Sequence, residues 1–255
     1  MKIEKYLPSE KLQPFIESLM IIESEAGMHN SILPDTAAVM AFRLKGGISY
    51  SDAAVQEHFP DSILSGLRKA PHAVHYEKNT AMLLVKFREG GATAFLRTPL
   101  HEISNTSISL DLLLKNTDEI TSRLMEARSN TQRIRIISTF LEKALLQQEQ
   151  DAMITYAVQQ IRSAKGTASI PALLQELYIS RDAFEKRFRR YVGTTPKHFS
   201  NIIRFKNIID THTVNQSLTA TAYAAGYFDQ AHFIRDFRIF TGKAPREFFR
   251  DGAYW

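Results

Sequence analysis

One stretch of the sequence occurs twice, and this repeat restricts the fold more than any other feature. Five residues recur at an offset of 49: Phe184, Phe188, Gly193, Pro196 and Phe199 match Phe233, Phe237, Gly242, Pro245 and Phe248. Tyr178 matches Tyr227 at the same offset, and Ser180 matches Asp229, so the alignment needs no insertion. A period of about 50 residues indicates a duplicated supersecondary unit.

The first copy predicts two short helices separated by a tight turn. Ser169 is suited to cap the first helix, and Pro171 lies in its first turn, where a missing N–H costs little. Ser180 then caps a second helix, which ends at Gly193. Two helices joined by so short a turn form a helix-turn-helix.

The second copy repeats this design. Ser217 precedes a helix over residues 218–225, and Asp229 caps a helix that continues to Phe240. Another helix, from about Pro196 to His212, is predicted to join the two copies. Residues 151–255 are therefore predicted to form an all-α double helix-turn-helix domain.

Residues 1–108 are predicted to form a mostly β domain. Short apolar segments alternate with Gly and Pro, and the best strand candidates are Ser18–Ile22, Ala37–Leu44 and Ala81–Phe87. Strands at this spacing are typical of a small sandwich or barrel. A short helix is expected from Leu7 to Ile16, with Ser9 as its cap.

Residues 109–150 are predicted to be a helical connector. Apolar residues fall at helical spacing in two runs: Leu110, Leu113, Leu114, Ile120 and Leu124, then Ile134, Ile137, Leu141 and Leu145. Two interpretations are open: the stripes pack on their own domain, or they form the seam of a homodimer. The polar stretch Gln147–Gln150 marks the boundary. The expected fold class is α+β with two domains, a small β sandwich or barrel with following helices and then the all-α domain.

The positive charge of the chain is concentrated in the repeated part. Residues 1–150 hold 17 Lys/Arg and 18 Asp/Glu, whereas residues 151–255 hold 15 and 9, a net charge of +6. A basic domain favours a polyanion such as double-stranded DNA as its partner. The absence of cysteine excludes disulfides, thiolate metal sites and Cys nucleophiles. Without a signal peptide or a long apolar run, the chain is expected in the cytoplasm and away from membranes.

The capped helix after each turn is predicted to enter the major groove of DNA. Phe184, Phe188 and Tyr191 share one helix face and must be buried, which leaves the opposite face for DNA. The residues expected to read bases are Asp182, Glu185, Lys186, Gln230, Ala231, Ile234 and Arg235. Those expected to hold phosphates are Arg181, Arg189, Arg190, Lys197, Lys206 and Arg238. Ile234, expected to be exposed, is suited to cover a thymine methyl group.

The connecting helix sets the distance between the two motifs. Roughly 16 residues span about 24 Å, and successive major grooves on one face of DNA lie about 34 Å apart. One chain is then able to read an asymmetric site. The alternative is a non-catalytic architectural or partner-binding protein, in which the basic face of the helical domain is only solvated.

Residues 227–250, YFDQAHFIRDFRIFTGKAPREFFR, resemble the signature of the AraC/XylS-type transcription regulators. The matching residues are Gly226, Tyr227, Phe233, Arg235, Phe237, Arg238, Gly242, Pro245 and Phe248. The resemblance covers about residues 152–250, and the first copy follows it more loosely. It implies a transcription regulator with two helix-turn-helix motifs, often an activator that responds to a small molecule, and hence the transcription machinery as a partner.

The chain departs from that family pattern at three core positions. Thr221 stands where an apolar residue is usual, Ile208 where alanine is usual, and Phe249 where arginine is usual. These changes are expected to repack the core without removing DNA binding. The N-terminal part resembles the small β domains attached to some of these regulators, through Leu33-Pro34-Asp35 and the stretch from Phe87 to Ala92.

A pocket for a small-molecule effector is expected in the β domain. Its candidate residues lie in or beside apolar segments: Arg43, His72, His75, Tyr76 and Phe87. The alternative for each is ordinary surface or core. His72 and His75 have no carboxylate in a matching arrangement, so no metal or cofactor is predicted. The chain has no Gly-rich phosphate loop, no G-x-S-x-G elbow and no HExxH, and an enzyme is not expected.

Overall fold

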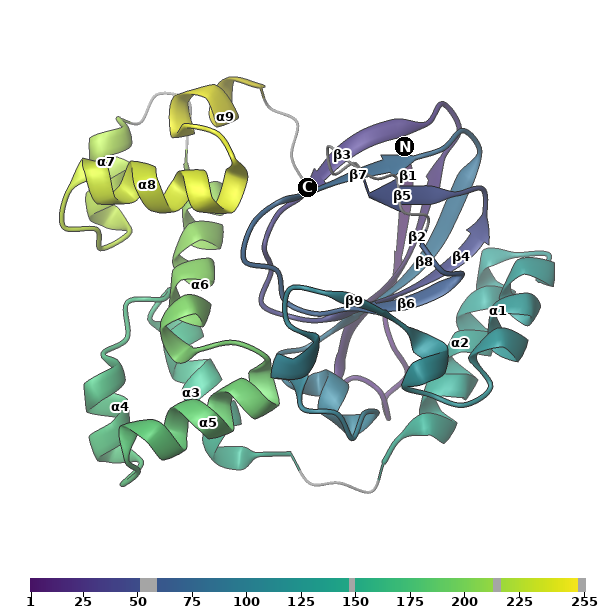
Figure 1. Ribbon diagram of the computed structural model, residues 1–255, viewed down its shortest axis with the longest axis horizontal. Helices are drawn as coiled ribbons and strands as arrows, with labels where there is room; N and C mark the ends of the chain where they lie inside the picture. Colours follow the sequence, from purple (N-terminus) through teal and green to yellow (C-terminus); the bar gives the residue numbers. More distant parts are fainter. Residues whose placement is uncertain (51–58, 147–149, 213–216, 252–255) are drawn as a thin grey trace.

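The computed structural model describes residues 1–255 except 51–58, 147–149, 213–216 and 252–255. Its N-terminal part consists of β-sheets with two helices packed beside them, and its C-terminal part is helical (Figure 1). The two predicted architectures are thus confirmed, and the fold class is α+β.

Within the described residues, the N-terminal part contains two antiparallel sheets. The larger has the strand order β1-β2-β8-β4-β6-β9, and the smaller has the order β3-β7-β5. The strands are β1 (Lys2–Tyr6), β2 (Ile16–Ser24), β3 (Met28–Ile32), β4 (Val39–Lys45), β5 (Ile48–Tyr50), β6 (Ser62–Ser65), β7 (His72–Tyr76), β8 (Thr80–Phe87) and β9 (Ser107–Ser109). The three segments predicted as strands correspond to β2, β4 and β8.

The helix expected from Leu7 to Ile16 does not form. The chain leaves β1 at Tyr6 and continues through turns, in which the Leu12 and Gln13 N–H groups both donate to the Ser9 carbonyl. Pro14 has no N–H to donate, the Phe15 and Ile16 N–H groups both donate to the Leu12 carbonyl, and β2 begins at Ile16. The prediction was wrong because two successive turns, closed on the Ser9 and Leu12 carbonyls, do not make a continuous helix.

Successive side chains of the central strands point to opposite faces of the larger sheet, and the two faces have different surroundings. On β8, Leu83, Val85 and Phe87 are buried in the core on one side of the sheet. Met82 and Leu84, between them in sequence, face the smaller sheet and line a cavity. The strand β8 therefore contributes side chains to the domain core on one face and to the cavity wall on the other.

Two helices complete the core of the β domain. They are α1 (Thr117–Glu126) and α2 (Asn130–Ala144), and both bury apolar residues against the larger sheet. Most apolar residues of the two stripes pack on their own domain, as the first interpretation expects, and the homodimer seam stays a prediction. Residues 110–112 form a 3-10 helix, η3 (Leu110–Leu112), after η1 (Gly91–Ala94) and η2 (Leu100–Ile103). Most of the predicted boundary at 147–150 lies outside the described residues.

The C-terminal part consists, among the described residues, of α3 (Ala152–Ser163), α4 (Ile170–Glu176), α5 (Arg181–Val192), α6 (Pro196–Thr211), α7 (Leu218–Ala224), α8 (Gln230–Thr241) and α9 (Pro245–Asp251). The helix α6 belongs to two cores at once. Phe199 and Ile203 pack with α3, α4 and α5, whereas Ile202, Phe205 and Ile208 pack with α7, α8 and α9. This shared helix holds the two motifs at a fixed separation.

Candidate DNA interface and effector cavity

The first motif consists of α4, a turn and α5. The Ser180 hydroxyl accepts a hydrogen bond from the Ala183 N–H at 3.4 Å, and Gly193 ends α5 in the left-handed region at φ 96°. Phe184 and Phe188 are buried. The outer face carries Arg181, Asp182, Lys186, Arg189 and Arg190, which are exposed, and Glu185, which is half-buried.

The second motif consists of α7, a turn and α8. The Asp229 carboxylate accepts from the His232 N–H at 2.7 Å, and the three phenylalanines of α8 are buried beneath it. Ala231, Arg235 and Arg238 are exposed, and Gln230 is half-buried. Ile234 differs from its prediction, because it is half-buried and packs on the core of this motif.

The two turns are not equivalent residue for residue, and the match of Tyr178 with Tyr227 is wrong. The Ile179 N–H bonds to the Leu174 carbonyl, as the Tyr227 N–H bonds to the Ala222 carbonyl. Tyr178 and Gly226 both have positive φ, 51° and 74°. The offset is therefore 48 before the turn and 49 after it, and Phe228 is the added residue.

Both recognition helices, α5 and α8, start on the side of the C-terminal domain farthest from the β-sheets (Figure 1). Their C-terminal ends point toward the β domain. The Arg204 guanidinium of α6, between them, donates to the Gly166 carbonyl at 3.2 Å and lies 5.1 Å from the centre of the Tyr227 ring. This side chain ties the segment before the first motif to the turn of the second.

Lys206 is not placed where a phosphate contact was expected. It lies on α6 and turns toward the β domain, where its ammonium group is 2.5 Å from the Asp35 carboxylate. Lys197, at the start of the same helix, is exposed. Arg181, Arg189 and Arg238 are exposed on α5 and α8, whereas the exposed Arg190 lines a hollow with Thr93 and Arg97 of the β domain. All of these phosphate contacts stay predictions.

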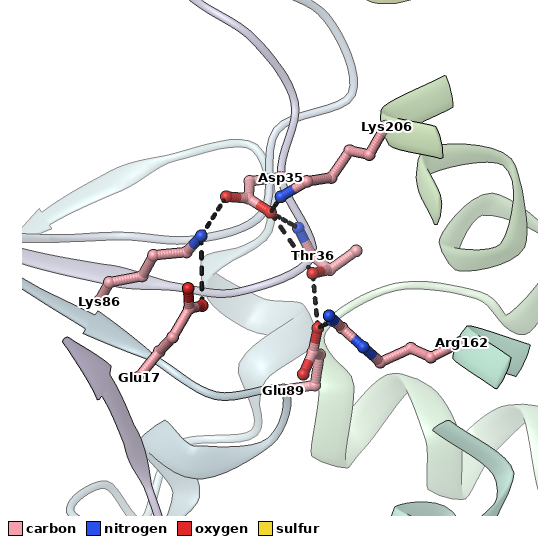
Figure 2. A network of polar contacts seen from close by, with 7 residues as sticks. All are labelled: Glu17, Asp35, Thr36, Lys86, Glu89, Arg162 and Lys206. Carbon is pink, nitrogen blue, oxygen red and sulfur yellow. Dashed lines mark hydrogen bonds and ion pairs between the residues drawn. The ribbon is translucent and has the colours of Figure 1, made fainter. Parts of the chain in front are cut away.

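Figure 2 shows a polar network that joins the two domains. Asp35 accepts from Lys206 of α6 and, at 2.9 Å, from Lys86 of β8, which also contacts Glu17. The neighbouring Thr36 hydroxyl donates to Glu89 at 2.7 Å, and Glu89 pairs with Arg162 of α3. The network therefore links the β domain to α3 and α6 through ion pairs.

Apolar contacts also join the domains. Leu33 packs on the core of the second motif, and Leu67 is buried in the core of the first. Gly90, at φ 74°, lies so close to α5 that an added Cβ would be 2.0 Å from the Tyr191 ring. The β domain thus contacts both motifs.

A cavity of about 180 Å³ lies between the two sheets of the β domain. Its walls are mostly aliphatic and aromatic side chains from β4, β6, β7 and β8, and its polar residues are Asp35, Ser65, Arg68 and His72. The Arg68 guanidinium donates to the Asn105 carbonyl at 2.9 Å and lies 3.1 Å from His72 Nε2. The space suits a mostly apolar molecule with one polar end.

The cavity includes two of the five residues predicted for it, His72 and Tyr76. Arg43 lines a separate hollow and pairs with Asp61. Phe87 faces the opposite side of the larger sheet, and His75 stacks on His29 with ring centres 4.2 Å apart. A spacing of three along β7 puts His72 and His75 on opposite faces of the strand, so only His72 lines the cavity. Among the described residues, no group of His, Asp or Glu is arranged to hold a metal ion.

Sequence reasoning missed Arg68 and Asp35 as cavity residues. Arg68 follows Gly66 in a loop, and only the fold brings it beside β7. Asp35 was noted for its family resemblance alone, although an acidic residue after Leu33-Pro34 and before an apolar strand was a usable signal.

Residues 173–251 match the family described as a helix-turn-helix domain. The C-terminal domain is an AraC-type helix-turn-helix domain. The chain is accordingly a DNA-binding transcription regulator. Residues 4–109 match a family described as a domain of unknown function, and no curated protein matches the chain. No helix in the described part of the AraC-type domain or of the β domain is long and apolar enough to cross a membrane.

Solved structures with a similar course of the chain include ToxT from Vibrio cholerae, at 12% identity and TM-score 0.49, covering 98% of each chain. Another ToxT structure is described as bound to an unsaturated fatty acid, at 14% identity and TM-score 0.46, covering 92% of this chain and 96% of that one. The xylose-binding transcription activator XylR is 18% identical over 49% of this chain and 38% of its own, at TM-score 0.36.

Proposed function

We propose that this regulator reads one asymmetric DNA site with both recognition helices of a single chain. The observation that carries the proposal is that α5 and α8 start on the same side of the domain, away from the β-sheets, and are held by the shared helix α6. Since one chain carries both helices, binding requires no homodimer. The contact with the transcription machinery and an activating role are part of the same proposal.

In vitro selection of bound DNA with the full chain tests this proposal. We expect two short conserved segments about one helical turn apart and a preference of roughly 10³-fold or more over bulk DNA. A site with five base pairs inserted between the segments is the matched control, because it turns one segment to the opposite face of the duplex. Equal binding to both sites, or no selected sequence, would contradict the proposal.

We also propose that a small, mostly apolar molecule binds in the cavity and modulates DNA binding. An apolar cavity of about 150 Å³ is large enough for benzene, and the cavity here is of similar size. A sugar would leave most of its hydroxyl groups without partners against these walls. Arg68 and His72 supply the one polar end.

Thermal-shift measurements with benzene, indole and glucose test the ligand class. We expect benzene and indole to raise the unfolding temperature and glucose to leave it unchanged. Ala41→Phe fills the cavity from β4 and is expected to abolish the shifts. A shift with glucose alone, or shifts that survive in A41F, would overturn the assignment of the ligand to this cavity.

A further inference from the structure

The two turns of the AraC-type domain each expose one aromatic ring. Tyr178 is 96% exposed and Phe228 is 86% exposed, and these are the two most exposed large hydrophobic side chains in the described part of the chain. Both precede the cap of a recognition helix, Ser180 and Asp229 respectively. Neither ring is buried against the protein, so packing within the fold does not explain them.

The two turns expose their aromatic rings with different backbone conformations. In the first turn the aromatic residue occupies the left-handed position itself, where Tyr178 has φ 51°. In the second turn Gly226 occupies that position, and the aromatic residue is the additional one, Phe228. A left-handed conformation disfavours a bulky side chain. The two turns differ in backbone conformation, yet both expose an aromatic ring, and at Tyr178 the ring stands at a position that disfavours a bulky side chain. This indicates that the rings contact a binding partner.

The position of the turns indicates the partner. Figure 1 shows both turns at the side of the domain where the recognition helices begin, remote from the β-sheets. In helix-turn-helix proteins the first residues of the recognition helix contact base edges. A residue one position before the cap, as Phe228 is, or two positions before it, as Tyr178 is, then lies at the edge of the groove beside the sugar–phosphate backbone.

We propose that Tyr178 and Phe228 seat the two recognition helices by packing their rings on the sugars at the groove edge, with the Tyr178 hydroxyl donating to a phosphate. This inference rests on the proposed binding of one DNA site by both motifs. A ring packed on deoxyribose buries apolar surface, whereas a hydroxyl contact to phosphate fixes register without reading sequence. The two residues are positioning residues, and they add affinity without adding charge.

The experiment uses the full chain and the DNA site obtained by selection. The variants are Tyr178→Gly, Phe228→Ala and, as a control at another exposed apolar residue, Leu112→Ala of the β domain. We expect each turn variant to lower affinity about ten-fold, in line with the burial of one aromatic ring, and L112A to bind as wild type. The slope of log affinity against log salt is expected to stay unchanged, because no cation is removed.

Thermal unfolding distinguishes a contact from a structural role. Glycine suits the left-handed position, so Y178G is expected to unfold at the wild-type temperature or above it while binding DNA more weakly. Tyr178→Phe is expected to retain most of the affinity, since it keeps the ring. Wild-type affinity in both turn variants would overturn the proposal, as would full DNA binding with lost transcriptional activity, which indicates a protein partner. If the wild-type chain selects no site, the proposed function itself fails.

Discussion

Asp35 takes part in three features of the molecule: the cavity, an ion pair within the β domain and an ion pair between the two domains. Its carboxylate lines the cavity, pairs with Lys86 inside the β domain and pairs with Lys206 of the DNA-binding domain. Burial opposes its ionisation, but the ammonium groups of Lys206 and Lys86 outweigh burial and hold the pKa of Asp35 well below its usual range. The same contact raises the pKa of Lys86 against the effect of burial. Asp35 and Lys86 therefore stabilise each other's charged form.

Replacing Asp35 by asparagine is expected to loosen the interface between the domains. The Asp35→Asn variant leaves Lys206 without its anionic partner, and a partly exposed ion pair contributes about 1 kcal/mol or less. Hydrogen exchange should therefore become faster in α6, at the residues around Lys206, and stay unchanged in β1. The control is Asp61→Asn, which removes an ion pair with Arg43 inside the β domain. Equal protection of α6 in all three proteins would contradict the role of Asp35.

The same carboxylate predicts a dependence on acid. Because the pKa of Asp35 is lower in the folded protein than the value of about 3.9 in an unfolded chain, its contribution is present above that unfolded value and is lost as pH falls through the folded one. Urea unfolding at pH 7 and pH 3 is expected to show a larger loss of stability for the wild type than for D35N. Identical losses would show that Asp35 is not held ionised by the two lysines.

At the scale of elements, the helices of the DNA-binding domain were predictable because their signals are local. The predicted caps Ser169, Ser180, Ser217 and Asp229 each accept a hydrogen bond from the first turn of the helix that follows. Such a cap depends only on residues within one turn. The strands β2, β4 and β8 were likewise predictable from short apolar segments between Gly and Pro, although the face on which each side chain lies was not predicted.

Other features of the site depend on three-dimensional geometry that the spacing of residues in the sequence does not reveal. The inserted Phe228 was missed because Tyr227, an aromatic residue like Tyr178, matched it at an offset of 49. Backbone hydrogen bonds show the offset to be 48 at that point. Phe87 was assigned to the pocket by its apolar strand, yet parity along β8 turns it to the other face. Lys206 was assigned to DNA by its charge, and its partner Asp35 lies 171 positions away in sequence.

Two arginines on α8 provide a test of how this element faces DNA. Arg235 and Arg238 are both exposed, one turn of helix apart. Arg235→Ala is expected to cost about 1–3 kcal/mol of binding and to relax preference at one base pair. Arg238→Ala is expected to weaken all sequences alike and to flatten the salt dependence. Binding to a set of single-base variants at several salt concentrations separates the two, and identical profiles for both variants would contradict the assigned faces.

At the scale of the whole molecule, the cavity and the DNA-binding domain share two segments of chain. Leu33 and Leu67 both line the cavity, while Leu33 packs on the second motif and Leu67 on the first. A molecule in the cavity thus touches residues that contact both motifs. We therefore expect a displacement of these segments by a bound molecule to reach the two motifs through separate contacts, Leu33 to the second and Leu67 to the first.

Occupation of the cavity is therefore expected to change DNA affinity, and DNA is expected to change ligand affinity by the same factor. Linkage requires this reciprocity, and typical couplings are about 5–150-fold. The measurement is titration of the selected DNA site with and without saturating indole, and titration of indole with and without DNA. The Leu67→Ala variant removes side-chain contacts with the first motif. It is expected to reduce the effect of indole on DNA affinity and the effect of DNA on indole affinity together, whereas L112A leaves both unchanged. Indole binding that alters DNA affinity in neither direction would show that the cavity and the recognition helices act independently.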